Sequence, residues 1–314
     1  MKNQIALIIL RFGSSPAFFD LWAKSAVCNE EIDFLIFTNC KNDFQRYYNK
    51  YKNLKFFYIT QAEVERRIAE KTGFNYKFVS GYKLCDFKPS LGLLFEDFIE
   101  KYDFWGYCDT DLFFGNICSF ISDDILNSCD RLFSLGHLSI YRNNDFMKKI
   151  FLTNNSSQIS FGNVCSTDKV LGFDELSGMH QICLNKGIRY LYPQDDIFDI
   201  DIFHYNMHKG IELKIEKPPL AFYWSFGHLY AITKDGRKKE ILYAHFQKRK
   251  MSLFIDENKK NFGFFCNKCV SCDSITELLL EWKKNRNVFI SVSYYLKNKL
   301  LFNLNRIKRR VSIK

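Results

Sequence analysis

The sequence predicts an α/β protein with a mainly parallel β-sheet that carries helices on both faces. In the first 110 residues, short apolar runs alternate with segments whose apolar residues recur at helical spacing. Strands that alternate with helices in this way are typical of parallel sheets. Apolar residues make up 47% of the 314-residue chain and charged residues 25%. These proportions are typical of a globular protein and exclude a mainly disordered chain, a collagen and a coiled coil.

The elements expected in this first half follow one another in a regular order. Apolar, strand-like runs predict strands at residues 5–10, 33–37, 54–59 and 103–108. Apolar spacing predicts helices at residues 17–28, 44–52, 63–72 and 90–101. Thr60 and Glu63 form a capping-box pattern at the start of the third of these helices.

The second half of the chain predicts fewer regular elements. Strands are expected at residues 132–141, 210–217 and 221–230, and a helix at 174–186. Asp235-Gly236 is a hairpin turn signal, and a capping box at Ser274 opens a helical segment of roughly 40 residues. We therefore expect one domain at residues 1–250 and a mainly helical, basic extension at residues 251–314.

The sequence shows no recognisable signal peptide or membrane span, and its cysteines do not form a disulfide pattern, which together point to a reducing compartment. The apolar run at residues 5–10 is too short for a signal peptide, and no stretch approaches the ~18 apolar residues of a membrane span. The 11 cysteines are expected to be buried or free thiols rather than a disulfide framework. The sequence therefore predicts a cytoplasmic protein.

The net charge of +10 suits nucleic acid, an anionic membrane or a phosphorylated ligand. No zinc finger, recognition helix or RNA-binding aromatic motif accompanies it, so no nucleic-acid partner is expected.

Two acidic residues directly follow the strand expected at residues 103–108. Asp109 and Asp111 flank a single Thr110, and in extended chain such residues point to the same side. Open α/β sheets bind ligands at the C-terminal ends of their strands. A converging carboxylate pair suits a hard divalent cation that bridges to phosphate oxygens.

Several stretches in chain order resemble a known enzyme family. They lie at residues 16–22, 32–39, 82–89, 102–115, 136–143, 173–175 and 245–250. Together they resemble the glycosyltransferases of the GT-A fold, and more narrowly a bacterial group of polysaccharide-biosynthesis transferases catalogued largely as a domain of unknown function. The resemblance implies a GT-A-like, Rossmann-related sheet. It also implies transfer of a sugar from a nucleotide-sugar donor, UDP-linked, to a glycan or lipid-linked acceptor of surface-polysaccharide biosynthesis.

The resemblance also implies a metal site. Asp109, Asp111 and His245 would hold Mn²⁺ or Mg²⁺ against the donor diphosphate, and Lys248 would bind phosphate. The imidazole ligand favours Mn²⁺. The structural alternative for His245 is a packed core histidine.

Further residues are expected to line the donor site. These are Arg11 and Gly13 after the first strand, Thr38 and Asn39 after the second, and Asp86 and Lys88 before the metal strand. Asn39 stands where the family has Asp, at a position that faces the base or ribose. Lys88-Pro89 could instead be a plain helix start.

Three residues are candidates for catalysis. Asp174 or Glu175 would deprotonate the acceptor hydroxyl, as a carboxylate does in inverting members of the fold. The alternative is structural, because acids are favoured in the first turn of a helix. His137 is expected to contact donor or acceptor, and a histidine next to Gly can equally be structural.

Two other functions remain open at this stage. A haloacid-dehalogenase-like phosphatase also uses Asp-x-Asp, but it places Thr or Val where this chain has Phe113. The other is a non-catalytic nucleotide- or sugar-binding module. Cys266, Cys269 and Cys272 have ligand-like spacing but no fourth ligand nearby, so no zinc site is predicted there.

The C-terminal segment has the pattern of a basic amphipathic helix. Val292, Leu296, Leu300, Leu304 and Ile307 recur about every four residues. Residues 297–314 hold seven basic side chains and no acidic one. Two interpretations follow for residues 288–314: a helix packed on its own domain, or one that docks on an anionic membrane surface and places the enzyme peripherally on the inner face of the cell membrane.

Overall fold

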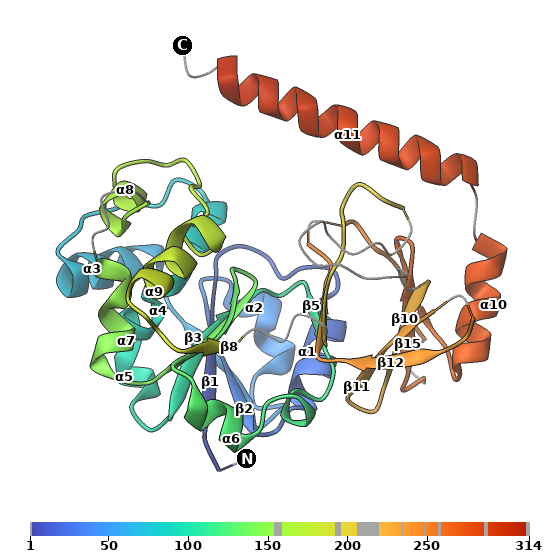
Figure 1. Cartoon of the computed structure of the whole chain (residues 1–314), viewed down its shortest axis with the longest axis horizontal. Coiled ribbons are helices and arrows are strands. Elements are labelled where there is room, and N and C mark those ends of the chain that lie inside the picture. The colour runs from blue at the N-terminus through green and yellow to red at the C-terminus, as the bar shows by residue number, and fades with distance from the viewer. Residues whose placement is uncertain are drawn as a thin grey trace. The chain divides into compact units, whose positions relative to one another are not determined.

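The chain folds into two compact units in the computed structural model (Figure 1). The structure describes residues 2–153, 159–191, 196–205, 220–233, 235–247, 249–256, 259–285 and 288–311. Residues 1–110 and 118–193 form the first unit, and residues 111–117 and 194–314 form the second. These two units differ from the domains expected at residues 1–250 and 251–314. The expected domain boundary at residue 250 stays a prediction. The strand expected at residues 210–217 lies outside the described residues.

The first unit is built on a seven-stranded mixed sheet, in the order β3-β2-β1-β4-β7-β6-β8. The strands are β1 (Ile5–Arg11), β2 (Ile32–Thr38), β3 (Leu54–Tyr58), β4 (Phe104–Cys108), β6 (Arg131–Leu135), β7 (Leu138–Arg142) and β8 (Tyr190–Leu191). The first four strands are parallel, and β7 pairs antiparallel with both β4 and β6. The mainly parallel α/β sheet predicted from the sequence is confirmed.

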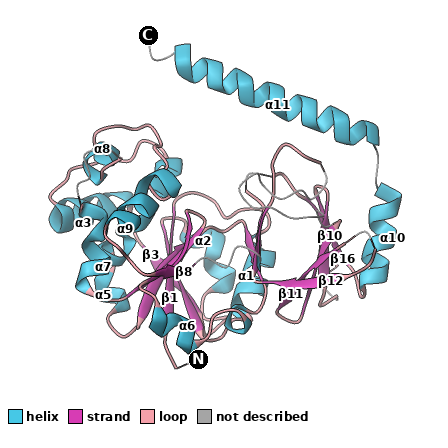
Figure 2. Cartoon of the chain, in the orientation of Figure 1, coloured by secondary structure: helices cyan, strands magenta, loops and turns pink. Residues whose placement is uncertain are grey.

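Helical segments flank this sheet (Figure 2). They are α1 (Phe19–Val27), α2 (Lys41–Phe44), η1 (Gln45–Tyr47), α3 (Gln61–Thr72), η2 (Gly81–Ser90), α4 (Leu91–Leu94), α5 (Glu96–Ile99), η3 (Ile117–Ser119), α6 (Asp123–Ser128), α7 (Asp145–Lys149), η4 (Ile150–Leu152), α8 (Phe161–Cys165), η5 (Leu176–His180) and α9 (Gln181–Asn185). Ile8 and Leu35 belong to one buried cluster together with Val64 of α3. Phe34, which precedes Leu35 in β2, points to the opposite face of the sheet. It packs edge-on against Trp22 of α1, with ring centroids 5.7 Å apart. Because both faces of the strands are buried, their sequences are continuously apolar.

Local signals placed most of these elements correctly. The Thr60 side chain accepts a hydrogen bond from the backbone N–H of Glu63, so the predicted cap of α3 is confirmed. The helix expected at residues 90–101 is divided between α4 and α5, because Phe95 leaves the helical region (φ −117°, ψ 29°). The single strand expected at residues 132–141 is a hairpin of β6 and β7 that turns at Gly136-His137.

The second unit holds two sheets. Six strands lie in the order β12-β11-β10-β15-β16-β14, and three lie in the order β5-β13-β9. Their bounds are β5 (Leu112–Phe114), β9 (Ile197–Asp199), β10 (Ala221–Ser225), β11 (His228–Ile232), β12 (Lys238–Ile241), β13 (Tyr243–His245), β14 (Ser252–Phe254), β15 (Phe262–Phe265) and β16 (Lys268–Ser271). The strand expected at residues 221–230 is therefore two strands, which turn at Phe226-Gly227 with positive φ at both residues. Residues 252–271 add three strands to a segment expected to be mainly helical.

Two helices end the chain, α10 (Ile275–Asn285) and α11 (Val288–Val311). The Ser274 side chain accepts from the N–H of Glu277, which confirms the predicted cap of α10. α10 lies close against β15, where a Cβ on Gly263 would be only 2.4 Å from Leu278 Cδ1. The 11 cysteines are free, and the Cys266, Cys269 and Cys272 thiols are buried, as the sequence predicts.

Candidate active site

The first unit gathers polar residues at the carboxyl ends of its central strands. β1 lies between β2 and β4, so the chain proceeds from β1 toward β2 and β3 on one side and later returns to β4 on the other. Open α/β sheets bind ligands at such a reversal of strand order. Arg11 is in register with Thr38, and Asp109 follows the end of β4. Arg11, Thr38 and Asp109, three of the sequence-predicted donor residues, thus lie at the carboxyl ends of neighbouring strands.

A hydrogen bond from a backbone N–H to a side-chain oxygen joins the loops after β1 and β2. The Gly13 N–H donates to Asn39 Oδ1 at 2.9 Å, and φ of Gly13 is +88°, a conformation that favours glycine. Thr38 is buried, and its Oγ1 accepts from the Cys40 N–H. The Arg11 guanidinium donates to the Ser14 carbonyl. The four predicted residues Arg11, Gly13, Thr38 and Asn39 therefore lie along two adjoining loops.

Lys88 is the centre of a buried charge cluster beside these loops. Its Nζ lies 2.7 Å from Asp109 Oδ1 and 3.2 Å from Asp174 Oδ2, and it donates to the Gly136 carbonyl at 2.9 Å. Burial disfavours the ammonium form, but Asp109 and Asp174 outweigh it and hold the pKa of Lys88 well above its usual value. Lys88 is thus a fixed cation among two carboxylates.

Asp174 is a buried acid of this cluster with a raised pKa. It is 3% exposed, and burial raises its pKa to about 7, a shift that Lys88 opposes and that Glu175 and Asp109 reinforce. Glu175 Oε2 accepts from the Gly136 N–H at 3.2 Å. The turn approaches the acids closely at Gly136, where a Cβ would lie 2.5 Å from Asp174 Oδ2 and would make that side chain shift. A carboxyl group that titrates near neutral pH suits proton transfer.

Asp86 has a different place from the one expected. It is fully buried, and its carboxylate pairs with Lys83 Nζ at 2.9 Å and accepts the N–H groups of Leu171 and Phe173, each at 2.9 Å. These bonds hold the segment that leads directly into Asp174. The geometry favours a positioning role for Asp86 over the predicted contact with a donor sugar.

His137 occupies the tight turn between β6 and β7. It is 4% exposed, and its carbonyl accepts the backbone N–H of Asp109 at 2.9 Å. His137 is therefore tied through its backbone to one of the two predicted metal ligands.

The second unit brings Asp111 and His245 together through its three-stranded sheet. β13 pairs antiparallel with β5, so that His245 is in register with Leu112, the residue after Asp111. His245 Nε2 lies 3.4 Å from Asp111 Oδ1. That oxygen is buried and accepts no hydrogen bond from the part of the chain that the structure describes. A buried carboxylate oxygen without a donor, facing an imidazole nitrogen, fits a site for a divalent cation.

Asp199, which was not predicted from the sequence, contacts the other nitrogen of the same ring. β9 pairs parallel with β13 and puts Asp199 in register with His245, and Asp199 Oδ1 lies 2.8 Å from His245 Nδ1. Burial disfavours the imidazolium, but Asp111 and Asp199 outweigh it and raise the pKa of His245 to about 10. A second Asp-x-Asp, Asp199-Ile200-Asp201, was the available signal. Lys248, the predicted phosphate ligand, lies outside the described residues.

Comparisons with known proteins show similarity to solved structures and to a protein family. Among these structures is that of the galactosyltransferase LgtC in complex with donor and acceptor sugar analogues, which is 13% identical to this chain. The match covers 63% of this chain and 75% of that one, with a TM-score of 0.33. A search of curated proteins finds no match. The sequence profile of a family of unknown function (DUF6625) matches residues 7–273, and the chain therefore belongs to this family.

Proposed function

We propose that the protein is a metal-dependent glycosyltransferase that moves a sugar from a nucleotide-sugar donor, UDP-linked, to a glycan or lipid-linked acceptor of surface-polysaccharide biosynthesis. The observation that carries the proposal is the pair of Asp111, which lies shortly after the end of β4 in the chain, and the buried His245 of β13, whose Nε2 is 3.4 Å from Asp111 Oδ1. The galactosyltransferase LgtC has been solved with donor and acceptor sugar analogues, which is consistent in kind with a sugar-transfer reaction.

The proposed metal ligands are Asp109, Asp111 and His245. Asp109 is a candidate whatever the placement of the two units, since one intervening residue limits its Cα to about 7 Å from that of Asp111. Two carboxylates and an imidazole suit Mn²⁺, and Mg²⁺ less well. When bound, such a metal neutralises charge on the departing nucleoside diphosphate.

Residues of the first unit would bind the donor and move the proton. In this proposal Gly13 and Asn39 line the nucleotide site, and Lys88 supplies a fixed positive charge near the diphosphate. Asp174 serves as the general base that takes the proton from the acceptor hydroxyl, because its pKa near 7 leaves it substantially ionised at neutral pH. Lys88, whose Nζ lies 3.2 Å from Asp174 Oδ2, keeps that carboxylate in place.

Turnover of a panel of nucleotide sugars tests the proposal. With Mn²⁺ present, release of nucleoside diphosphate is expected from at least one UDP-sugar. His245→Ala should abolish this Mn²⁺-dependent release. The matched control is His228→Ala, since His228 pairs with Glu240 at 2.6 Å in the same unit. Metal-dependent diphosphate binding without hydrolysis or transfer of any donor would instead favour a non-catalytic binding module.

We also propose that α11 docks on an anionic membrane surface near the lipid-linked acceptor. One side of the helix contacts its own unit through aromatic pairs, including Tyr294 with Tyr205 at 5.6 Å. Within the predicted stripe, Val292, Leu296 and Leu300 are 55%, 61% and 61% exposed. No described helix is both long and apolar enough to cross a bilayer. Exposed apolar residues with neighbouring lysines fit the interface of an anionic bilayer.

Vesicle sedimentation tests this docking. Phosphatidylglycerol vesicles should carry down the full chain at low salt, release it as salt rises, and fail to bind a chain that ends at residue 287. Leu296→Gln with Leu300→Gln should weaken binding, whereas phosphatidylcholine vesicles should bind neither protein. Equal recovery of the full and shortened chains in the supernatant would leave α11 as a helix that only packs on its own domain.

A further inference from the structure

Asp199 and Gln247 form a bonded pair behind the imidazole of His245. Asp199 is the last residue of β9, and the parallel register places it directly beside His245. Its Oδ1 lies 2.8 Å from His245 Nδ1 and also accepts a hydrogen bond of 2.8 Å from Gln247 Nε2. All three residues belong to the second unit, and the contacts fix the ring from the side opposite Asp111.

The chemistry of this contact decides which ring nitrogen is available to a metal. An ionised carboxylate only accepts hydrogen bonds, so Asp199 requires the proton of His245 to sit on Nδ1. The remaining nitrogen, Nε2, is the one that lies 3.4 Å from the buried Asp111 Oδ1. Asp199 therefore keeps its proton on Nδ1 and fixes the ring orientation, so that loss of the second ring proton leaves the lone pair on Nε2, the nitrogen that faces Asp111.

The backbone at Gln247 supports the same arrangement. Gln247 has φ of +50°, in the left-handed region that non-glycine residues rarely adopt. Such strain persists only where surrounding contacts fix it, and it concentrates at functional sites. Here the unusual backbone accompanies a side chain whose amide holds the carboxylate of Asp199.

We infer that Asp199 is a positioning residue of the metal centre, which orients His245 for coordination through Nε2, and that Gln247 holds Asp199 in place. This inference rests on the proposed function, because it presumes that His245 binds the metal. Partners of this kind change metal affinity by about 10- to 100-fold when they are removed.

Mn²⁺ titration monitored by electron paramagnetic resonance tests the inference without any measurement of turnover. Asp199→Ala should weaken Mn²⁺ binding by about 10- to 100-fold, and Asp199→Glu should restore part of it. Asp199→Asn preserves the shape of the side chain and should also weaken binding, which guards against a loss caused by misfolding. The matched control is Asp196→Asn, since Asp196 precedes the same strand but pairs with Lys239 at 3.2 Å.

A spectroscopic signature separates positioning from a general structural effect. Pulsed resonance detects the coupling of a coordinated histidine nitrogen to Mn²⁺, and this coupling should be strong in the unchanged protein and absent in His245→Ala. In Asp199→Ala the coupling should be weakened, while circular dichroism stays unchanged. Gln247→Ala should give a smaller effect in the same direction.

The outcomes distinguish this inference from the proposed function. If the unchanged protein binds no Mn²⁺, or if His245→Ala binds it equally well, the proposed metal centre itself is wrong and the inference fails with it. If His245→Ala loses the metal but the Asp199 variants bind it as tightly as the unchanged protein, with an unchanged histidine coupling, only the inference is overturned.

Discussion

At the scale of single residues, burial rather than sequence pattern gives Asp174 its chemistry. The side chain is 3% exposed and lies 3.2 Å from Lys88 Nζ, yet the cost of burial dominates and raises its pKa to about 7. The sequence identified Asp174 and Glu175 as a pair but could not rank them, because burial depends on residues 86–88 and 136 folding onto them. The structure assigns the neutral-range titration to Asp174.

Asp174→Asn gives a stability prediction whose sign follows from that pKa. In the unfolded chain the group ionises near its ordinary pKa of about 4, whereas in the folded protein it keeps its proton up to about pH 7. The stabilising contribution of this proton is complete below about pH 4 and is lost as the pH rises through 7. Compared with the unchanged protein, the variant should therefore be relatively more stable at pH 8 than at pH 5. Urea titrations at both values check this, and an equal difference at the two would contradict the assignment.

Gly136→Ala tests how closely the turn approaches the acidic pair. The added Cβ would meet Asp174 Oδ2 at 2.5 Å and Glu175 Oε1 at 2.7 Å, so one of these side chains has to move. We expect a loss of about 1–3 kcal/mol in the free energy of unfolding, together with a loss of transfer activity. Gly81→Ala is the control, since the nearest atom to its Cβ would be 3.9 Å away. Equal denaturation midpoints for the two variants would show that the turn tolerates a side chain.

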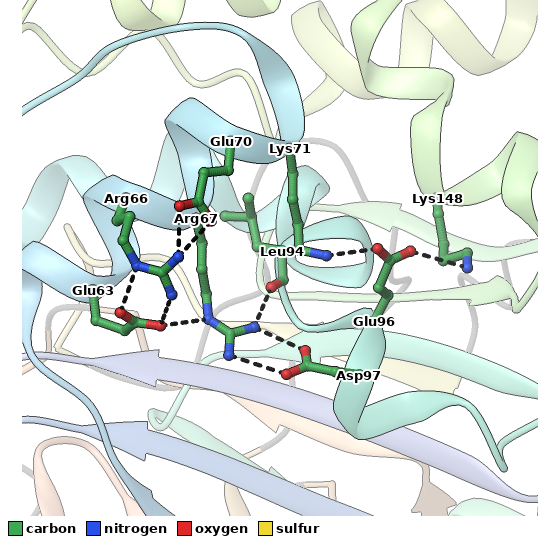
Figure 3. Close-up of polar contacts among 9 residues, drawn as sticks. All are labelled: Glu63, Arg66, Arg67, Glu70, Lys71, Leu94, Glu96, Asp97 and Lys148. Carbon is green, nitrogen blue, oxygen red and sulfur yellow. Dashed lines mark hydrogen bonds and ion pairs between the residues drawn. The ribbon is translucent and has the colours of Figure 1, made fainter.

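At the scale of elements, Arg67 joins α3 to the two helices that follow it, α4 and α5 (Figure 3). Arg67 forms two hydrogen bonds with the Asp97 carboxylate and donates to the Leu94 carbonyl at 2.8 Å. Its guanidinium also lies 5.4 Å from the ring centre of Phe95. The side chain of Arg67 is 15% exposed, whereas that of Arg66 is 54% exposed.

Two alanine variants measure this difference. Arg67→Ala should cost about 1.5–3 kcal/mol in the free energy of unfolding, the range of hydrogen bonds to charged groups. Arg66→Ala should cost less than Arg67→Ala, because exposed ion pairs are screened by water and salt. Guanidinium denaturation at fixed ionic strength compares them, and equal losses would mean that burial does not distinguish the two pairs.

The elements that the sequence predicted best are those with a local signal. Thr60 and Ser274 mark the starts of α3 and α10 because a capping hydrogen bond needs only neighbouring residues. The hairpins at residues 136 and 226 were not predicted, since their flanking strands are apolar on both sides of the turn. The break at Phe95 also lacked a signal, because no proline or glycine stands there.

At the scale of the whole molecule, the sequence predicted the parallel sheet and the acidic pair but not the partners that surround them. His245 was inferred through a family resemblance rather than from its contacts Asp111 and Asp199, which are more than 40 residues away in sequence. Asp199 meets His245 and Gln247 only because β9 and β13 pair in a particular register. Contacts of this kind depend on tertiary structure, and no periodicity in the chain encodes them.

Calorimetric titration of UDP in the presence and absence of Mn²⁺ tests whether the proposed metal centre binds the donor diphosphate. We expect Mn²⁺ to strengthen UDP binding to the unchanged protein. Asp111→Asn should abolish this gain in affinity while the circular dichroism spectrum stays unchanged. Asp196→Asn is the control and should behave as the unchanged protein does. Equal UDP affinity with and without Mn²⁺ in the unchanged protein, or an undiminished metal effect in Asp111→Asn, would contradict the account.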